Sequence, residues 1–334
     1  MKILLIGNSG FIGTYLSKKL LSSGHEVVGM DINPPKDEKS VSDFHLGDVT
    51  NLQDIIKASF GVEAIINLAA KHHDFGVSRD EFFKVNVQGT KNALDCATKY
   101  GIKKFIFYSS VAIYGDVKTF STEDTLPAPV NDYGRSKLEA EKLINVWAYE
   151  DSTRQAVIIR PTVVFGANNY ANMYNLIDKI YRKRFIFVGE GKNIKSVAYV
   201  ENLVDATIFL IQKFKTGLEI YNYSDYPQMT SQEISIIISH YLNRNIPNLK
   251  FPLNAAIVLA SVFDLTAKFT GYNFPITAAR IKKFNTSTYH KSEKIRALGF
   301  EPKIELSDGF RRMAEWYLIN LHKKKCILSQ SSED

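Results

Sequence analysis

The chain has 334 residues, of which 45% are hydrophobic and 23% are charged, as is usual for a globular protein with a sizeable core. Its two cysteines, Cys96 and Cys326, lie far apart and belong to no Cys/His cluster, so the sequence indicates neither a disulfide scaffold nor a metal site. The net charge of +7 favours an anionic partner. Since no nucleic-acid-binding motif is present, a phosphorylated substrate or an acidic lipid surface is favoured over nucleic acid.

No apolar stretch reaches the roughly 18 residues that a membrane-spanning helix requires. The apolar run that opens the chain is too short for the core of a secretory signal peptide before the first glycine follows. We therefore expect a cytoplasmic protein that does not cross a bilayer.

Strand-like and helix-like patterns alternate along the first half of the chain. Apolar, β-branched runs predict strands at residues 2–6, 26–30, 64–68, 104–109 and 157–159, and longer patterns predict helices at 11–21, 52–59 and 82–100. Continuous apolar runs suit strands that are buried on both faces, as parallel sheets require. The alternation predicts an α/β fold with a Rossmann-type, doubly wound parallel sheet.

After about Pro161 this alternation loosens. A helix is predicted at 173–184, a short strand at 185–188 and another helix at 202–213. We expect this second part of the chain to form a smaller lobe that binds the substrate.

A glycine motif directly follows the first predicted strand and opens the first predicted helix, at residues 7–13 with the sequence GNSGFIG. Glycines allow a sharp turn and a close approach to a pyrophosphate, which the helix N-terminus attracts. Asp31, about 20 residues further on, is placed to accept the ribose hydroxyls and to repel a 2′-phosphate. The motif therefore predicts NAD(H) rather than NADP(H), although Lys36 softens that preference. The alternatives are a turn without a ligand and a turn role for Asp31.

Tyr133 and Lys137 are four residues apart, so on a helix they share one face. The lysine ammonium favours the tyrosine phenolate and brings the phenol toward the pKa of a useful base. Such a pair also occurs by chance on solvated helix faces. Here Ser110 follows a strand, at the sheet edge where parallel sheets present ligands, and its hydroxyl is placed to bind a substrate oxygen.

Together these motifs resemble, in their order along the chain, the extended short-chain dehydrogenase/reductase family of NAD-dependent epimerases and dehydratases. The resemblance rests on the following segments: GNSGFIG at 7–13, the acid at 31, GD at 47–48, NLAA at 67–70, NVQGT at 86–90, SSVAIYG at 109–115, YGRSK at 133–137 and RPTVVFG at 160–166. It implies an NAD-binding Rossmann domain at 1–165, a mainly substrate-binding lobe at 166–320 with segments returning to the first domain, and a basic, polar tail at 321–334.

The resemblance also assigns roles to residues. Ser110, Tyr133 and Lys137 are the expected catalytic residues. The expected cofactor-binding residues are Gly7, Ser9, Gly10, Phe11, Ile12, Gly13, Asp31, Ile32, Asp48, Val49, Leu68, Ala69, Ala70, Asn86, Ser109, Tyr133, Lys137, Pro161 and Val163. Asn86 has an equally good alternative role, in which it braces a helix against a strand by hydrogen bonds.

The second half is similar to the bacterial members of this family that act as 4-epimerases of N-acetylglucosaminyl-diphospho-undecaprenol. Where enzymes of UDP-sugars usually have Arg-Asp-Phe, this chain has Lys195-Ser196-Val197, which replaces a two-pronged cation by a point charge. Alternatively, Lys195 lies on a solvated edge. The expected substrate-binding residues are His72, His73, Ser110, Val111, Ala112, Asn172, Lys195 and Tyr199.

Two basic segments each allow two interpretations, one of which is contact with a membrane. The apolar run 255–263 is followed by Lys268, Arg280, Lys282 and Lys283, a pattern that suits either an interfacial helix on an anionic membrane or a core helix with a solvated basic neighbour. The cluster at 322–325 is either membrane-facing or part of a solvated tail.

We therefore expect an NAD-dependent 4-epimerase that interconverts N-acetylglucosamine and N-acetylgalactosamine on undecaprenyl diphosphate through a 4-keto intermediate, for surface polysaccharide synthesis. The resemblance further implies a homodimer and peripheral contact with the inner face of the cell membrane. The alternatives are a UDP-sugar 4-epimerase, a 4-keto reductase of the hydroxysteroid-dehydrogenase type, and an NAD-sensing protein without activity.

Overall fold

The computed structural model describes residues 1–72, 76–117, 119–247, 249–270, 278, 281 and 285–330, and the side chains of 262–270 and 323–330 are not among those described. The chain forms two compact units. Unit 1 comprises Met1–Val164, Ala198–Asp225 and His290–Lys303, and unit 2 comprises Phe165–Val197, Tyr226–Tyr289 and Ile304–Asp334. The chain passes from one unit to the other within β7 (Val163–Phe165) and β10 (Val197–Tyr199).

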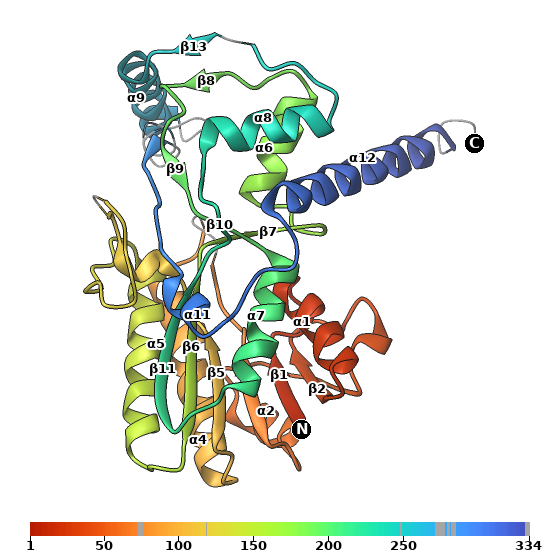
Figure 1. Ribbon diagram of the computed structural model, residues 1–334, viewed down its shortest axis with the longest axis vertical. Helices are drawn as coiled ribbons and strands as arrows, with labels where there is room; N and C mark the ends of the chain where they lie inside the picture. Colours follow the sequence, from red (N-terminus) through yellow and green to blue (C-terminus); the bar gives the residue numbers. More distant parts are fainter. Residues whose placement is uncertain are drawn as a thin grey trace. The chain divides into compact units, whose positions relative to one another are not determined.

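Unit 1 is built on a seven-stranded sheet with the strand order β11-β6-β5-β4-β1-β2-β3. All of its neighbouring strands run parallel. Figure 1 labels β1, β2, β5, β6 and β11 of this sheet. The strands are β1 (Lys2–Ile6), β2 (Glu26–Asp31), β3 (Asp43–Leu46), β4 (Ala64–Asn67), β5 (Lys104–Tyr108), β6 (Gln155–Pro161) and β11 (Gly217–Tyr223). The predicted doubly wound, Rossmann-type parallel sheet is confirmed.

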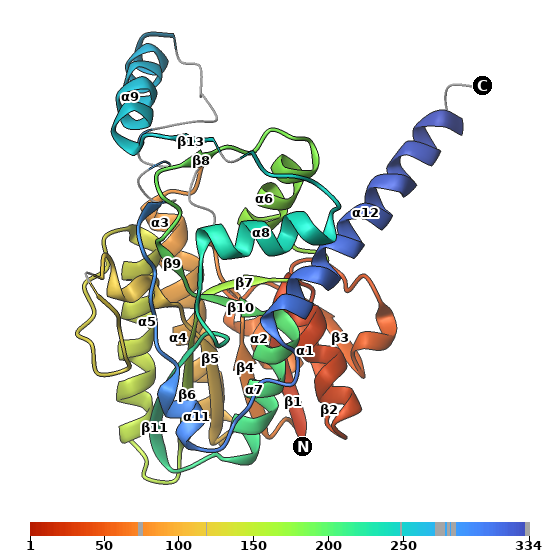
Figure 2. The ribbon, with the colours of Figure 1, turned by 45° about the horizontal axis from the view of Figure 1, so that its top comes forward.

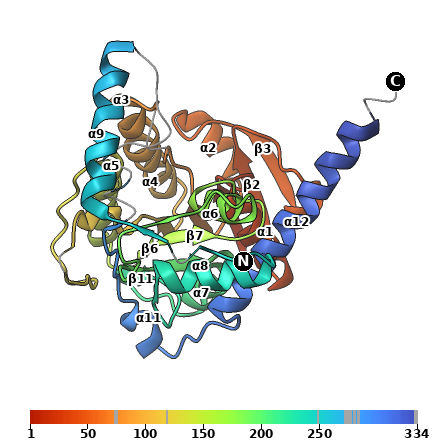
Figure 3. The same ribbon diagram turned by 90° about the horizontal axis from the view of Figure 1, so that it is seen from above.

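Helices cover both faces of this sheet. The helices of unit 1 are α1 (Phe11–Ser22), η1 (Glu38–Ser40), α2 (Leu52–Ala58), α3 (Arg79–Phe82), η2 (Phe83–Gln88), α4 (Gly89–Lys99), η3 (Val111–Tyr114), α5 (Asp132–Tyr149), α7 (Val200–Gln212) and α11 (Glu293–Ala297). Ile3 and Leu5 pack in one core with α1 and α7, whereas Leu4 and Ile6 pack in another with α2, α4 and α5. Figure 3 shows α4 and α5 on one side of β6 and α7 on the other. Because alternate side chains of a strand enter opposite cores, the central strands are apolar throughout.

Unit 2 is mainly helical. Its elements are α6 (Asn172–Tyr181), β8 (Phe187–Val188), β9 (Ile194–Lys195), β12 (Met229–Thr230), α8 (Ser231–Tyr241), β13 (Lys250–Phe251), α9 (Leu253–Thr270) and α12 (Leu306–Gln330), and most are labelled in Figure 2. Strand β12 pairs antiparallel with β9, and β13 pairs parallel with β8. The rings of Tyr174 and Tyr181 meet the edge of Tyr317 at centroid distances of 5.4 and 5.5 Å, which ties α6 to α12.

The structure corrects the helix predicted at 82–100. The chain instead forms α3, then the π-helical turn η2, then α4. A π turn contains one residue more than an α-helical turn, and such turns are frequent at functional sites. Here the turn contains Asn86, which lies fully buried.

Smaller differences concern strand limits. The sequence did not predict β3 and β11, whose burial is mixed because both are edge strands. The strand predicted at 185–188 is limited to β8. Among the helices that the structure describes, none is both long and apolar enough to span a bilayer.

Candidate active site

The carboxyl ends of β1, β4, β5 and β6 lie side by side because these strands are parallel neighbours in the sheet. Open α/β sheets bind their ligands at this edge. The strands deliver to it the glycine turn after Ile6, the segment after Asn67, the serines after Tyr108 and the segment after Pro161.

The glycine turn requires its glycines for steric reasons. Gly7 has a φ of +86°, and its amide donates a hydrogen bond to the Met30 carbonyl at 2.8 Å. A Cβ at position 13 would lie 2.1 Å from the Gly7 carbonyl oxygen, so α1 starts directly against the turn. Gly10 caps α1, whose first turn has neither a side-chain cap nor an acidic residue. The amides at this helix end are therefore suited to an anion.

Asp31 ends β2 beside this turn. Its Oδ2 accepts a hydrogen bond from the Ser9 amide at 3.1 Å, and its Oδ1 accepts one from the Asn33 amide at 3.0 Å. The neighbouring Ile32 is 62% exposed. Asp48 lies in the turn before α2, where its Oδ1 accepts a hydrogen bond from the Thr50 amide at 2.8 Å. Asp31 is thus fixed by the same loop that forms the glycine turn.

Helix α5 presents Tyr133 and Lys137 in its first two turns. Asn131 caps the helix by accepting a hydrogen bond from the Gly134 amide at 2.8 Å. A Cβ at Gly134 would lie 2.5 Å from the Ala112 carbonyl oxygen, so the helix packs closely against η3. Ser110 caps η3, and its Oγ accepts a hydrogen bond from the Ala112 amide at 3.1 Å. The start of α5 and the start of η3 are therefore held together, with the three predicted catalytic residues in one unit.

The Lys137 side chain is buried, with 1% of its surface exposed. Its Nζ donates a hydrogen bond to the Tyr108 carbonyl at 2.7 Å and lies 4.6 Å from the centroid of the Phe107 ring. Burial lowers the pKa of Lys137 to about 7, and the negative charge of Glu141 counteracts that shift. At neutral pH, whether Lys137 keeps its proton therefore depends on the groups that surround it.

Asn86 acts as a brace in this structure. Its Oδ1 accepts a hydrogen bond from the Lys71 amide at 2.9 Å, and its Nδ2 donates to the Lys71 carbonyl at 3.1 Å and to Ser136 Oγ at 2.9 Å. Ser136 in turn donates to the Tyr133 carbonyl at 2.8 Å. The side chain thus joins η2, the segment after β4 and α5, as in the bracing alternative considered from the sequence.

Three buried polar side chains near this edge have atoms without a hydrogen-bond partner among the described residues: the amide of Asn8, the hydroxyl of Ser109 and the hydroxyl of Thr162. Ser109 and Thr162 follow the neighbouring strands β5 and β6. Buried polar atoms ordinarily find partners, so these two hydroxyls are available for hydrogen bonds to a polar ligand. Ser109 was among the residues predicted from the sequence, whereas Thr162 was not, although Thr162 directly follows the predicted Pro161.

The other predicted cofactor residues lie along the same edge. Phe11, Ile12 and Gly13 form the first turn of α1, and Leu68, Ala69 and Ala70 are partly buried after β4. Val49 is buried and lies against Gly89, where a Cβ would approach Val49 Cγ1 to 2.7 Å. Pro161 is buried at the end of β6, whereas Val163 is 43% exposed.

The predicted substrate residues are divided between the units. Val111 and Ala112 lie in η3 of unit 1, and His72 is exposed beyond β4. His73 lies outside the described residues. Tyr199 also belongs to unit 1, where it is 1% exposed and donates a hydrogen bond to Glu201 Oε1 at 2.6 Å. Asn172 and Lys195 belong to unit 2.

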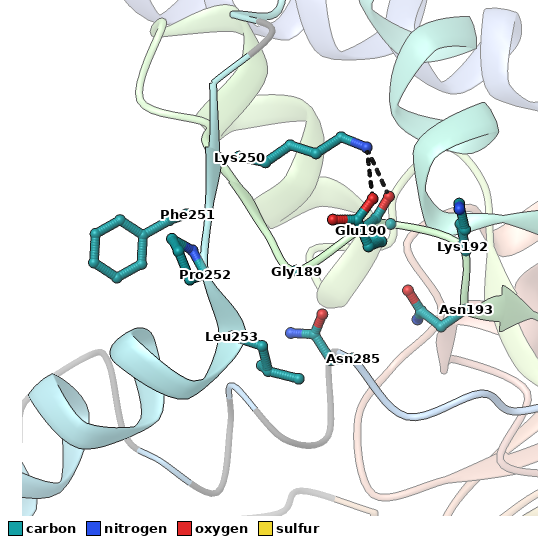
Figure 4. Close-up of a pocket in the computed structure, with 10 residues that line it drawn as sticks. Gly189, Glu190, Lys192, Asn193, Lys250, Phe251, Pro252, Leu253 and Asn285 are labelled. Carbon is teal, nitrogen blue, oxygen red and sulfur yellow. Dashed lines mark hydrogen bonds and ion pairs between the residues drawn. The ribbon is translucent and has the colours of Figure 1, made fainter.

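In unit 2, Asn172 is the exposed first residue of α6, and Lys195 Nζ donates a hydrogen bond to the Thr286 carbonyl at 2.6 Å. A cavity of about 520 Å³ lies at the start of α9. Its lining comprises Gly189, Glu190, Gly191, Lys192, Asn193, Lys250, Phe251, Pro252, Leu253 and Asn285. Figure 4 shows the Lys250 ammonium directed at the Glu190 carboxylate, at a distance of 3.3 Å. The cavity therefore combines cationic, amide and apolar groups.

Comparison with known proteins shows the family to which the chain belongs. Residues 3–223 match the model of the NAD-dependent epimerase/dehydratase family. The chain belongs to this family. It is 35% identical to the N-acetyl-alpha-D-glucosaminyl-diphospho-ditrans,octacis-undecaprenol 4-epimerase of Escherichia coli O157:H7, with 99% of both chains covered. It is 28% identical to the UDP-glucose 4-epimerase of Vibrio cholerae, with 95% of both chains covered.

The fold is also that of solved enzymes of this family. The Thermus thermophilus UDP-glucose 4-epimerase in complex with NAD superposes with a TM-score of 0.74 at 20% identity, with 95% of this chain and 99% of that chain covered. The predicted family, fold class and NAD dependence are thus confirmed, and the protein is an NAD-dependent enzyme of the epimerase/dehydratase type.

The residues of unit 1 fit NAD. The glycine turn and the α1 N-terminus suit the pyrophosphate, and Asp31 suits the adenosine ribose. At the nicotinamide end of the cofactor, the hydroxyls of Ser109 and Thr162 are suited to hydrogen bonds with its polar groups, since neither has a partner among the described residues.

The burial of Lys137 predicts a pH-dependent stability for the NAD-free protein. Its pKa is about 7 in the folded chain and 10.5 in the unfolded chain, so the unfolded state binds the proton more tightly and stability rises with pH across this window. Lys137→Met removes this dependence. We compare the difference in the free energy of unfolding, variant minus wild type, at the two pH values. We expect this difference to be at least about 1 kcal/mol more favourable to the variant at pH 6 than at pH 9.5. Urea unfolding at both pH values measures this, and an unchanged difference would contradict it.

Proposed function

We propose that this protein is an NAD-dependent 4-epimerase that interconverts N-acetylglucosamine and N-acetylgalactosamine on undecaprenyl diphosphate through a 4-keto intermediate. The observation that carries the epimerase chemistry is the position of Tyr133 one helical turn before the buried Lys137, on a helix packed against the segment that begins with Ser110. The observation that favours the lipid-linked sugar is 35% identity, over nearly the full length of both chains, to an enzyme named for that substrate.

In this proposal Tyr133 removes the proton from the 4-hydroxyl of the sugar and returns it to the 4-oxygen when hydride is delivered to the opposite face of the ketone. A charged Lys137 beside it stabilises the phenolate, which makes tyrosine a usable base near neutral pH. Ser110 donates a hydrogen bond to the 4-oxygen and stabilises the negative charge that develops there. Bound NAD⁺ supplies hydride acceptance and return at C4, so that no external reductant is consumed.

The two units differ in charge, which supports an anionic, lipid-linked substrate. Unit 2 has 17 Lys and Arg against 9 Asp and Glu, a net charge of +8, whereas unit 1 has 25 against 26, a net charge of −1. The whole positive excess of the chain therefore lies in the unit expected to bind the substrate. The cavity in Figure 4 contains Lys192 as well as Lys250, which is paired with Glu190, and a diphosphate is a suitable ligand for a lysine ammonium.

The start of α9 supports contact with an anionic membrane. Val258 and Leu259 are 64% and 53% exposed on this helix, and Leu249 just before it is 66% exposed. Apolar side chains on a basic unit suit shallow insertion among anionic lipid headgroups. We therefore extend the proposal to a peripheral location at the inner face of the cell membrane. We also propose that the protein forms a homodimer, as the family resemblance implies.

A UDP-sugar 4-epimerase is the second candidate, because the relative from Vibrio cholerae covers 95% of the chain. Purified enzyme incubated with undecaprenyl-diphosphate-linked or UDP-linked N-acetylglucosamine separates the two. We expect kcat/KM to be at least about tenfold higher for the lipid-linked sugar, with products identified after mild acid release. Conversion of the UDP-linked sugar alone would reject the lipid-linked substrate. A net change in NADH during turnover would instead indicate a reductase.

The same assay tests the base. Tyr133→Phe is expected to reduce turnover by about 100-fold or more while NAD binding persists, because the proton acceptor is lost and the ring is kept. Tyr149→Phe is a matched control, since Tyr149 lies on the same helix and is 71% exposed. Wild-type turnover by Tyr133→Phe would remove this residue from the mechanism.

Substitutions on α9 test the membrane contact. We expect Val258→Glu with Leu259→Glu to weaken binding to phosphatidylglycerol vesicles by about tenfold or more, because two exposed apolar side chains become charged. Ile319→Glu on α12, where Ile319 is 55% exposed, controls for added negative charge on unit 2. Co-sedimentation measures binding. Equal binding by the wild type, the α9 double variant and Ile319→Glu would exclude α9 from the membrane contact.

A further inference from the structure

A buried ion pair lies on the face of α5 that contains the catalytic residues. Arg160 Nε donates to Glu141 Oε1 at 2.9 Å, and Arg160 Nη2 donates to Glu141 Oε2 at 2.6 Å. The two side chains are 4% and 5% exposed. Removing two charges from water is costly, and such a pair is often no more stabilising than apolar residues of the same size. Its presence here therefore calls for a reason other than stability.

Glu141 is four residues beyond Lys137 and eight beyond Tyr133, so the three side chains share one face of α5. Glu141 is the charged group that acts on the Lys137 ammonium to keep its proton. Arg160 in turn neutralises Glu141 and holds it in a single geometry through two hydrogen bonds.

The other end of the pair reaches η3. Arg160 Nη1 donates to the Tyr114 hydroxyl at 2.7 Å, and that hydroxyl donates to Asn222 Oδ1 at 2.8 Å. Tyr114 is the last residue of η3, and Ser110 caps its first turn. Arg160 also directly precedes Pro161, at the end of β6. One ion pair thus connects α5, η3 and β6, the three elements that present Tyr133, Ser110 and Thr162.

We propose that Glu141, held by Arg160, is a positioning residue that keeps the Lys137 ammonium charged and fixes α5 in register against η3 and β6, so that Tyr133 acts as the base. The inference rests on the proposed roles of Tyr133 and Lys137 and is independent of whether the sugar is linked to a lipid or to UDP. Loss of the Glu141 charge leaves the Arg160 cation uncompensated, and both changes favour a neutral Lys137.

Burial favours the neutral forms of the other ionisable side chains around α5, including Glu123, whose carboxyl pKa it raises. Burial raises the pKa of Tyr108 on β5, Tyr114 on η3 and Cys96 on α4. The pKa of Arg160 on β6 is raised by Glu141. His290, stacked on Tyr114 at 6.0 Å, has its pKa lowered by burial to about 4 and is neutral above pH 6. A change with pH in the coupling between Glu141 and Lys137 therefore reports the charge of Lys137.

The test is a double-mutant cycle of Glu141→Gln and Lys137→Met in the NAD-free protein, followed by urea unfolding at pH 6 and pH 9.5. At pH 6 Lys137 is charged, and we expect the two positions to be coupled by about fivefold or more in the unfolding equilibrium constant. At pH 9.5 Lys137 is neutral in the folded state, and the coupling falls below about twofold. A brace that acts only through Arg160 gives equal coupling at both pH values, which would overturn the proposal.

Glu139→Gln is the matched control. Glu139 lies on the same helix but is 43% exposed and pairs with Lys142 at 2.7 Å. Its coupling with Lys137→Met is expected to stay below about twofold at both pH values. Should Glu141→Gln fail to fold, Glu141→Leu with Arg160→Met removes both charges and keeps an apolar core, and a smaller coupling with Lys137→Met that is still stronger at pH 6 than at pH 9.5 is expected. Absence of coupling in that background would also overturn the proposal.

A second measurement uses active enzyme. Glu141→Gln is expected to move the alkaline limb of the pH profile of kcat to lower pH, whereas Glu139→Gln leaves it in place. Because the unfolding cycle requires no substrate, its failure is distinguishable from a failure of the proposed function. An unchanged alkaline limb in Glu141→Gln would contradict the inference.

Discussion

The burial of one lysine ammonium constrains the chemistry of unit 1. Lys137 is 1% exposed, and its Nζ is bound by the Tyr108 carbonyl at the end of β5. A cation at this depth requires compensation, and it receives it from a backbone carbonyl, an aromatic face and the charge of Glu141. Because each of these groups belongs to a packed element, the helix that contains Tyr133 has little freedom to move relative to the sheet.

The surrounding packing serves the same constraint. Gly134 allows α5 to approach the Ala112 carbonyl, and Asn86 joins the start of α5 to the segment after β4. On the cofactor side, the glycine turn and two unpaired hydroxyls lie at the same sheet edge. In the proposed mechanism unit 1 supplies the groups for proton transfer and cofactor binding. Unit 2 contains the net positive charge and the exposed apolar residues of α9, on which the proposal of a lipid-linked sugar rests.

The parts of the site that depend on local sequence were predictable. The glycine turn, Asp31 and the Tyr133–Lys137 spacing each lie within one turn or one helix, and the structure has the strands and helices that their roles require. The segment predicted as one helix at 82–100 is helical, but the π turn within it was not predicted, because hydrophobic periodicity does not distinguish a single π turn from α-helix. The Glu141–Arg160 pair joins a helix to a strand 19 residues away. It was not predicted, because the pairing depends on the tertiary packing of α5 against β6. Thr162 was overlooked because an unpaired hydroxyl is visible only once its surroundings are known.

The central claim is that the Tyr133 phenol, beside a charged Lys137, reaches the reacting hydroxyl of the sugar. A crystal structure of the enzyme with NAD and an unreactive substrate analogue tests it most directly. We expect the Tyr133 oxygen to lie within about 3 Å of the sugar 4-oxygen, with C4 facing the nicotinamide. A Tyr133 hydroxyl directed away from the sugar, with another ionisable side chain at the 4-oxygen, would contradict it.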